Sequence, residues 1–226
     1  MNSYPDLLAL PQPAPHTVIF LDAVGTIIGV RDGVGEIYSE FAHKFGVECD
    51  PVQVNAAFYQ EFKVATPCVF PTATSGEIPE QEYQWWRSLN HRTFTRIGKI
   101  TEFRDFEGFF AELYAYFATA AAWEVYPDTL VALDRWQQQG FTLGVLSNFD
   151  TRLYAVLDAL DLRKYFSSIT ISTAARAAKP SQLIFQQALH QHSCLAHNAW
   201  HIGDSEVEDY QGATAAGLQA WLLTRG

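Results

Sequence analysis

The sequence predicts an α/β protein with a doubly wound, Rossmann-like parallel sheet of five strands and an all-helical unit inserted after the first strand. Two observations carry this prediction. From residue 122 onward, short apolar segments alternate with helical segments, which is the pattern of parallel strands joined by right-handed crossover helices. Residues 31–121 instead show only helical spacing and are rich in aromatic side chains. We therefore expect a core made of 17–30 and 122–226, interrupted by a helical insertion at 31–121.

Size and charge limit the possible classes of function. The chain has 226 residues, of which 48% are hydrophobic and 18% charged, so it can bury a full core and hold a smaller second unit. Its formal net charge is −10. This balance argues against a nucleic-acid or membrane partner, because either would require a basic face. A small anionic ligand remains compatible with the sequence, since its site needs only a few local donors.

The cysteines and the first residues indicate the compartment. Cys49, Cys68 and Cys194 form no CxxC pair or ligand-like cluster, which favours reduced thiols in a cytoplasmic protein. Residues 1–16 contain four prolines but no lysine or arginine, so we expect an irregular N-terminal arm and not a signal peptide. No apolar run is long enough to span a bilayer.

The first strand is expected within residues 17–26, TVIFLDAVGT, an apolar run that ends in one acidic residue and a glycine. A run rich in β-branched and aromatic residues is typical of a strand buried on both faces. In an open parallel sheet, ligands bind beyond the carboxyl ends of the strands. Asp22 therefore lies where chemistry is expected. The apolar residues that follow, 26–30, are expected to form a short extended flap.

Helical periodicity and turn residues define the remaining elements. In the insertion, the expected elements are helices over 37–45, from Pro51 onward, over 80–97 and over 105–120, with a loop over 67–79 that contains three prolines. After residue 122, the expected strands are 142–146, 168–171, 199–203 and 219–223. The expected helices between and after them are 128–139, 151–159, 181–191 and 206–216.

Polar residues follow several of these strands. Ser147 and Asn148 close the second sheet strand, Lys179 lies in the loop before a helix, and Asp204 and Asp209 follow the fourth strand. A hydroxyl and an amide at a strand-to-helix turn can bind phosphate oxygens together with backbone N–H groups. A lysine can neutralise the same phosphate as a point charge.

Two of the acidic residues also indicate a metal site. Asp22 and Asp204 are expected on strands that could be neighbours, and carboxylates are the hard oxygen ligands that Mg²⁺ prefers. Mg²⁺ usually keeps several waters and contacts the substrate phosphate as well. The sequence therefore predicts a combined phosphate and metal site at the edge of the sheet.

The order of these motifs resembles that of the haloacid dehalogenase superfamily. The segment DAVGT at 22–26 is similar to the first motif of that family, Ser147-Asn148 to the second, Lys179-Pro180 to the third and GDSEVED at 203–209 to the fourth. Each motif alone is weak, but four in order at strand ends are specific. The resemblance covers the core, and the insertion matches the position of the family's helical cap, with the active site expected in the cleft between cap and core.

The resemblance implies a role for each matching residue. In phosphatases of the family, the residue matching Asp22 attacks phosphorus and forms an aspartyl phosphate. The residues then implied in phosphate binding are Thr26, Ser147, Asn148 and Lys179, of which Lys179 also takes part in catalysis. The residues implied in holding Mg²⁺ are Asp22, the backbone carbonyl of Val24 and Asp204, with Asp209 in support. The implied substrate is a small phosphate ester.

One position departs from the phosphatase pattern. Those enzymes carry a second Asp two residues after the nucleophile, where it protonates the leaving oxygen and then activates water, but here the position is Val24. General acid–base help of this kind is worth about 10² to 10⁴ in rate. We therefore expect weakened or altered acid–base catalysis in a phosphatase-type enzyme.

The departure leaves three alternatives open. A catalytically silent relative would bind a phosphorylated metabolite or a protein partner. A 2-haloacid dehalogenase also lacks the second Asp and has a similar opening motif, but works without metal. A phosphonoacetaldehyde hydrolase uses a cap lysine, for which Lys63 would be the candidate.

Overall fold

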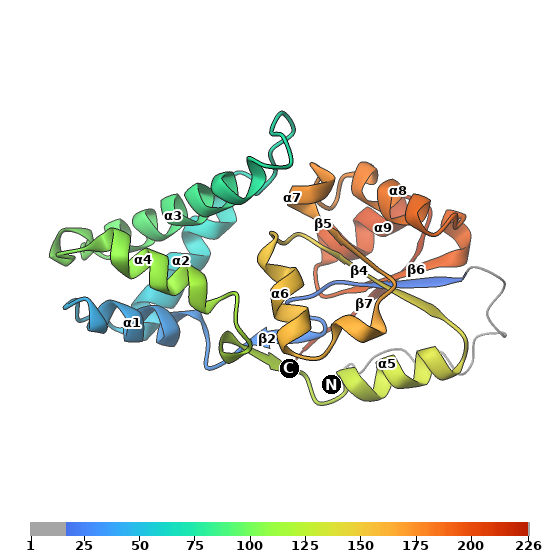
Figure 1. Cartoon of the computed structure of the whole chain (residues 1–226), viewed down its shortest axis with the longest axis horizontal. Helices are drawn as coiled ribbons and strands as arrows, with labels where there is room; N and C mark the ends of the chain where they lie inside the picture. The colour runs from blue at the N-terminus through green and yellow to red at the C-terminus, as the bar shows by residue number, and fades with distance from the viewer. Residues whose placement is uncertain (1–16, 226) are drawn as a thin grey trace. The chain divides into compact units, whose positions relative to one another are not determined.

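The computed structural model describes residues 17–225, and the irregular arm expected at 1–16 lies outside the described residues (Figure 1). Two compact units divide the chain. The first contains the residues up to Gly29, Cys68–Thr72 and Val125 onward, and the second contains Val30–Pro67 and Ala73–Glu124. The boundaries at 29–30 and 124–125 fall within the two strands of a small sheet, β2 (Ile28–Val30) and β3 (Trp123–Val125).

A five-stranded parallel sheet forms the centre of the first unit, with the strand order β5-β4-β1-β6-β7. The strands are β1 (Val18–Leu21), β4 (Thr142–Ser147), β5 (Ser168–Ile171), β6 (Ala199–Gly203) and β7 (Gln219–Leu222). The central strand β1 is buried throughout, because helices cover both faces of a parallel sheet. This confirms the predicted fold class.

The register places the carboxyl ends of β1, β4 and β6 side by side. Val18 at the start of β1 is aligned with Thr142 of β4 and with Ala199 of β6, so the three strands run in step. Because parallel strands end at the same edge of the sheet, the residues that follow β1, β4 and β6 gather there. Asp22, Ser147 and Asp204 are the residues at or directly after those ends.

Helices connect the strands on both sides of the sheet (Figure 1). They are α5 (Thr129–Gln138), α6 (Arg152–Ala159), α7 (Ser172–Ala175), α8 (Gln182–Gln191) and α9 (Gly212–Ala215). On one face, Ile184 and Phe185 of α8 pack with Phe20 of β1 and Ala213 of α9 in a continuous apolar cluster. Such burial stabilises the fold by roughly 1.5–3 kcal/mol for each large side chain.

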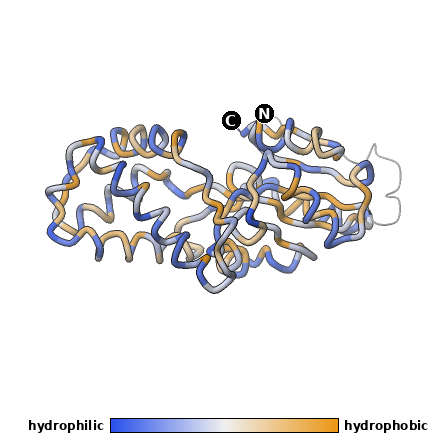
Figure 2. Tube along the Cα trace, turned by 90° about the horizontal axis from the view of Figure 1, so that it is seen from above, coloured by the Kyte–Doolittle hydropathy of each residue, from blue (hydrophilic) through white to orange (hydrophobic). Residues whose placement is uncertain are grey.

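The second unit is helical and aromatic, as the sequence predicts. Its helices are α1 (Val34–Lys44), α2 (Pro51–Val64), α3 (Ile78–Arg96) and α4 (Phe106–Tyr116). Hydrophobic and hydrophilic residues follow one another along them (Figure 2). The buried sides meet in a single cluster that includes Phe58, Phe94 and Phe109, with ring pairs such as Phe94 and Phe109 at 5.2 Å between centroids. No helix within residues 17–225 combines the length and apolar character needed to cross a bilayer.

Four local expectations need correction. The helix expected over 206–216 begins as a π-helix (Glu206–Gln211), in which Tyr210 N–H bonds to Ser205 C=O, and becomes α-helical only at Gly212. The helix expected from 80 begins at Ile78, because a proline fits the first turn of a helix. The helix expected to reach 120 ends at Tyr116. The flap is shorter than expected, since β2 (Ile28–Val30) pairs with the unforeseen strand β3 (Trp123–Val125).

Candidate active site

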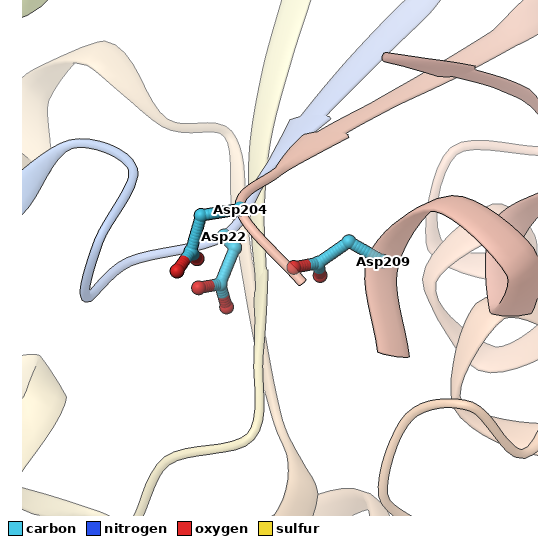
Figure 3. A group of neighbouring side chains, drawn as sticks. All are labelled: Asp22, Asp204 and Asp209. Atoms are coloured by element: carbon cyan, nitrogen blue, oxygen red, sulfur yellow. The ribbon is translucent and has the colours of Figure 1, made fainter. Parts of the chain in front are cut away.

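Two carboxylates stand at the ends of adjoining strands. The backbone N–H of Asp22 donates to the carbonyl of Ile202 at 2.9 Å, so Asp22 still belongs to the ladder between β1 and β6. Asp204 directly follows β6, and Figure 3 shows its carboxylate beside that of Asp22 while Asp209 approaches from the π-helix. One oxygen of each of these three residues lies within 4.8 Å of the others. The structure thus brings together the acidic residues that the sequence analysis selected.

A tight turn after Asp22 makes room for this arrangement. Gly25 has a φ of +85°, and a Cβ atom at this position would lie 2.4 Å from Oδ2 of Asp204. The turn is closed by the N–H groups of Ile27 and Ile28, which both donate to the carbonyl of Ala23. Only glycine satisfies both the backbone conformation and the close approach of Asp204.

Lys179 links the two sides of the site. Its Nζ donates to Oδ1 of Asp22 at 2.7 Å and also to Oδ1 of Asp209, and the residue is only 3% exposed. The side chain of Ser147, at the end of β4, forms a further hydrogen bond with the carboxylate of Asp22. Three strand ends and the loop before α8 therefore converge on one buried ion pair network.

Asn148 fixes the loop that carries Lys179. Its Oδ1 accepts from the backbone N–H of Lys179 at 2.7 Å, and its Nδ2 donates to the backbone carbonyl of the same residue at 3.0 Å. Nδ2 also donates to Glu208 at 2.9 Å. The hydroxyl of Thr26 donates to Oδ1 of Asp204 at 3.4 Å. The phosphate-binding role expected of Asn148 and Thr26 thus remains a prediction, while their bonds here order the site.

The pKa values of the four ionisable groups Asp22, Lys179, Asp204 and Asp209 are shifted by burial and by their mutual charges. Burial opposes the charged forms, yet the carboxylates of Asp22 and Asp209 raise the pKa of Lys179, and Lys179 and His201 lower the pKa of Asp209. Burial raises the pKa of Asp22, with Lys179 in opposition. The pKa of Asp204 is raised to about 6, first by partial burial of its carboxyl group, which otherwise stays open to solvent, and then by the like charges of Asp22 and Asp209.

The donor set fits a hard divalent cation. Lys179 pairs with Asp22 and Asp209 but not with Asp204, so one lysine stands against three carboxylates and net negative charge is left at the site. Asp204 is also exposed to solvent, whereas Asp22 and Asp209 are buried, so an ion can reach it. Carboxylate oxygens in this arrangement are the ligands that Mg²⁺ takes, with waters completing its shell. Val24, whose carbonyl is the third expected ligand, lies in the turn after Asp22 and is bridged to Ile28.

A second glycine permits the position of Asp209, and replacing it is expected to destabilise the protein. A Cβ atom on Gly203 would lie 2.1 Å from Cγ of Asp209, so Gly203→Ala forces the π-helix away from β6. We expect a loss of about 1–3 kcal/mol in the free energy of unfolding, measured by urea denaturation. Gly76→Ala is the control, because a Cβ there meets nothing within 4 Å. Equal unfolding free energies for the two variants would contradict the packing described here.

Two site residues were missed by the sequence analysis. His201 is fully buried in β6 and its Nε2 lies 2.8 Å from Oδ1 of Asp209. Glu208 is bonded to Asn148, and burial raises the pKa of its carboxyl group. The sequence does contain one indication of the role of His201, namely its place inside an apolar strand. A polar ring buried in a parallel sheet needs a hydrogen-bond partner. For Glu208 the sequence offered no signal beyond its place in an acidic run.

Curated relatives are similar in sequence to this chain along most of its length. Haloacid dehalogenase-like hydrolase domain-containing protein 3 of Danio rerio is 32% identical over 211 residues, which cover 93% of this chain and 86% of that protein. The protein of the same name from Bos taurus is 32% identical over 202 residues, covering 89% and 79%.

Solved structures agree at the level of the fold. A haloacid dehalogenase-superfamily phosphatase from Thermococcus onnurineus matches with a TM-score of 0.62 at 20% identity, covering 93% of this chain and 87% of that one. L-2-haloacid dehalogenase from Xanthobacter autotrophicus matches with a TM-score of 0.68 at 14% identity, covering 90% and 76%. The family model described as haloacid dehalogenase-like hydrolase matches residues 16–217, nearly the whole chain. This protein therefore belongs to the haloacid dehalogenase-like hydrolases.

Proposed function

We propose that this hydrolase is an Mg²⁺-dependent phosphatase-type enzyme that acts on a small phosphate ester through an aspartyl phosphate at Asp22. The observation that carries the proposal is the pairing of Asp22 and Asp204 at the ends of β1 and β6, with Lys179 bonded to Asp22. A phosphoryl group that enters here would meet a carboxylate nucleophile, a fixed ammonium group and the Ser147 hydroxyl. These are the parts that phosphoryl transfer needs, namely positioning and charge neutralisation.

The chain's own groups define the first chemical step. An oxygen of Asp22 attacks phosphorus, the bond from phosphorus to the ester oxygen breaks, and the alcohol leaves with a proton taken from solvent. Lys179 neutralises charge on the transferred group, and Ser147 and Thr26 offer further hydroxyl donors. Water then hydrolyses the aspartyl phosphate, which releases inorganic phosphate and restores Asp22.

A bound Mg²⁺ ion would supply Lewis-acid stabilisation of the phosphoryl oxygens. We propose that Asp22, Asp204 and the backbone carbonyl of Val24 hold it, with Asp209 in support through Lys179. The helical second unit would then act as the cap that selects the substrate. A cytoplasmic location, without nucleic-acid or membrane partners, completes this proposal and is supported by the acidic charge and the cysteine pattern.

Removal of the metal gives the first test. Purified protein with Mg²⁺ is expected to release phosphate from an activated aryl ester such as p-nitrophenyl phosphate, and EDTA is expected to reduce this release by at least about 100-fold, because charge on the phosphoryl oxygens is then left unscreened. Release of p-nitrophenol is followed by absorbance. Excess Mg²⁺ should restore the rate after chelation, which controls for unfolding. Turnover that persists in EDTA would rule out the metal assignment.

Specific residues bear on each of the three alternatives to this proposal. Val24 supports a catalytically silent protein that binds a phosphorylated metabolite, because its side chain offers no acid. The dehalogenase alternative needs no metal, and the cluster of Asp22, Asp204 and Asp209 does not favour it. Chloride release from 2-chloropropionate in the presence of a chelator would nevertheless establish it. Lys63, the candidate for Schiff-base chemistry, is an exposed residue of α2 with no feature that supports such a role.

A further inference from the structure

His201 is a polar ring in an apolar environment. It lies in the middle of β6, is 0% exposed, and is aligned with Phe20 of β1 and Ala220 of β7. Its ring packs edge-on against Phe185 of α8, with 5.5 Å between the ring centroids. Burying an imidazole among such neighbours costs free energy unless a hydrogen bond compensates. A phenylalanine would suit the same place without that cost, so the polar ring calls for an explanation.

The hydrogen bond of His201 defines its protonation. Nε2 lies 2.8 Å from Oδ1 of Asp209, and Nδ1 has no hydrogen-bond partner among residues 17–225. An ionised carboxylate can only accept, so the N–H must be on Nε2. A second N–H on Nδ1 would be a buried donor without an acceptor, so the ring is neutral. Burial also lowers the pKa of His201, which agrees with this assignment.

The carboxylate of Asp209 accepts hydrogen bonds from three donors, which lie in β6, in the residue directly before the π-helix and in the loop before α8. Oδ2 accepts from the backbone N–H of Ser205 at 2.9 Å, and Oδ1 accepts from both His201 and Lys179. Lys179 in turn donates to Asp22. Without His201, Oδ1 would lose one of its two donors, and the carboxylate would be held only by Lys179 and by the backbone N–H of Ser205. The direction of the lysine Nζ toward Asp22 would then be less well defined.

We propose that His201 is a positioning residue of the phosphoryl-transfer site, whose Nε2–H fixes the Asp209 carboxylate that holds Lys179 against Asp22. The inference rests on the proposed function of Asp22 and extends it to a residue that does not touch the substrate. A positioning role explains why an imidazole is buried here, which packing alone does not explain. Hydrogen-bond partners that orient metal ligands without touching the reacting groups typically contribute about 10- to 100-fold to metal affinity or activity. We expect the loss of His201 to lower kcat by a similar factor.

Two substitutions separate positioning from packing. His201→Phe removes the donor but suits the apolar neighbours, so the protein is expected to fold with a melting temperature close to that of the wild type. Its kcat for p-nitrophenyl phosphate should fall about 10- to 100-fold, with a much smaller change in KM, because an interaction that matters mainly in the transition state is lost. His201→Gln keeps an N–H at the place of Nε2 and should recover most of kcat. An unchanged kcat in His201→Phe would overturn the proposal.

His192→Phe is the matched control. This histidine also packs edge-on against the same cluster, at 5.5 Å from Phe20, and its Nε2 bonds to Ser168 at 2.7 Å, away from Lys179. Loss of the ring nitrogens there is expected to leave kcat unchanged. An equal loss of kcat in both variants would show that removing either histidine from this apolar cluster affects turnover through packing, and would also overturn the proposal.

A second measurement does not depend on turnover. Nitrogen-edited NMR of the imidazole should show His201 as the neutral Nε2–H tautomer, with an N–H signal that shifts strongly in Asp209→Asn. An Nδ1–H tautomer, or a signal indifferent to Asp209→Asn, would exclude the hydrogen bond on which the proposal depends. If the wild type shows no Asp22-dependent hydrolysis, the proposed function fails, whereas this signal still decides whether His201 holds Asp209.

Discussion

Asp22→Asn is expected to abolish the release of phosphate from p-nitrophenyl phosphate, with a fall in kcat on the order of 10⁴-fold. An amide oxygen is a poor nucleophile toward phosphorus, and covalent catalysis is lost when the nucleophile is removed. The substitution also removes one of the two negative charges that face Lys179, so binding of Mg²⁺ is expected to weaken. Both effects are measured on one preparation, by absorbance for turnover and by calorimetry for Mg²⁺.

The fold of the variant must be shown to be intact. Asn is close in size to Asp and can still accept from Lys179, so the circular dichroism spectrum should be unchanged. Asp158→Asn on the exposed side of α6 serves as the control for loss of one carboxylate elsewhere, and should keep full activity. Activity that survives in Asp22→Asn would mean that the observed hydrolysis belongs to another site or to a contaminant, and the proposed mechanism would be abandoned.

The sheet could be predicted because its strands carry a strong local signal. Val18–Leu21 and Thr142–Ser147 are largely apolar runs that are followed by Asp22 and Asn148, and all of their residues except the half-buried Thr142 are buried, as a parallel sheet requires. The site followed from the same signal. Since strands in a parallel sheet end at one edge, the acids after β1 and β6 were expected at the same edge, and they meet because the structure places the two strands next to each other.

The local geometry of the site could not be predicted in the same way. The backbone of Lys179 is held by Asn148, 31 residues away in sequence, and Asp209 is placed by contacts with Lys179, His201 and Ser205. Such bonds depend on tertiary structure and leave no periodicity in the sequence. The π-helix at Glu206–Gln211 has the same origin, because an acidic run at this position reads as an ordinary helix start.

Long-range packing also explains why Cys68–Thr72 were not assigned to the first unit. The segment lies within a loop that the prolines of 67–79 predict, and nothing in its composition marks it as part of the sheet-containing unit. In the structure, Ser172 at the start of α7 donates to the carbonyl of Cys68 at 3.5 Å. This hydrogen bond joins residues 104 positions apart in the sequence, a separation that no local pattern reveals.

Val24→Asp is expected to raise kcat for an alkyl phosphate by about 10²-fold or more, because it adds the acid that can protonate the leaving oxygen and then activate water. Val24 is only partly buried and lies in the turn after Asp22, so a carboxylate there keeps contact with solvent. The gain should be much smaller for p-nitrophenyl phosphate, whose leaving group needs little protonation. Rates for the two substrates, measured by phosphate release, therefore distinguish acid catalysis from a general improvement of the site.

Val24→Asn is the matched control, since it has nearly the size and shape of Val24→Asp but cannot donate or accept a catalytic proton. It should show no gain with either substrate. Equal rates for both variants would mean that the frame formed by Asp22, Lys179 and Asp204 does not use an acid at this position. If that result came with tight binding of inorganic phosphate, the binding role would be favoured over the enzymatic one, because the site would then recognise a phosphate group without turning an ester over.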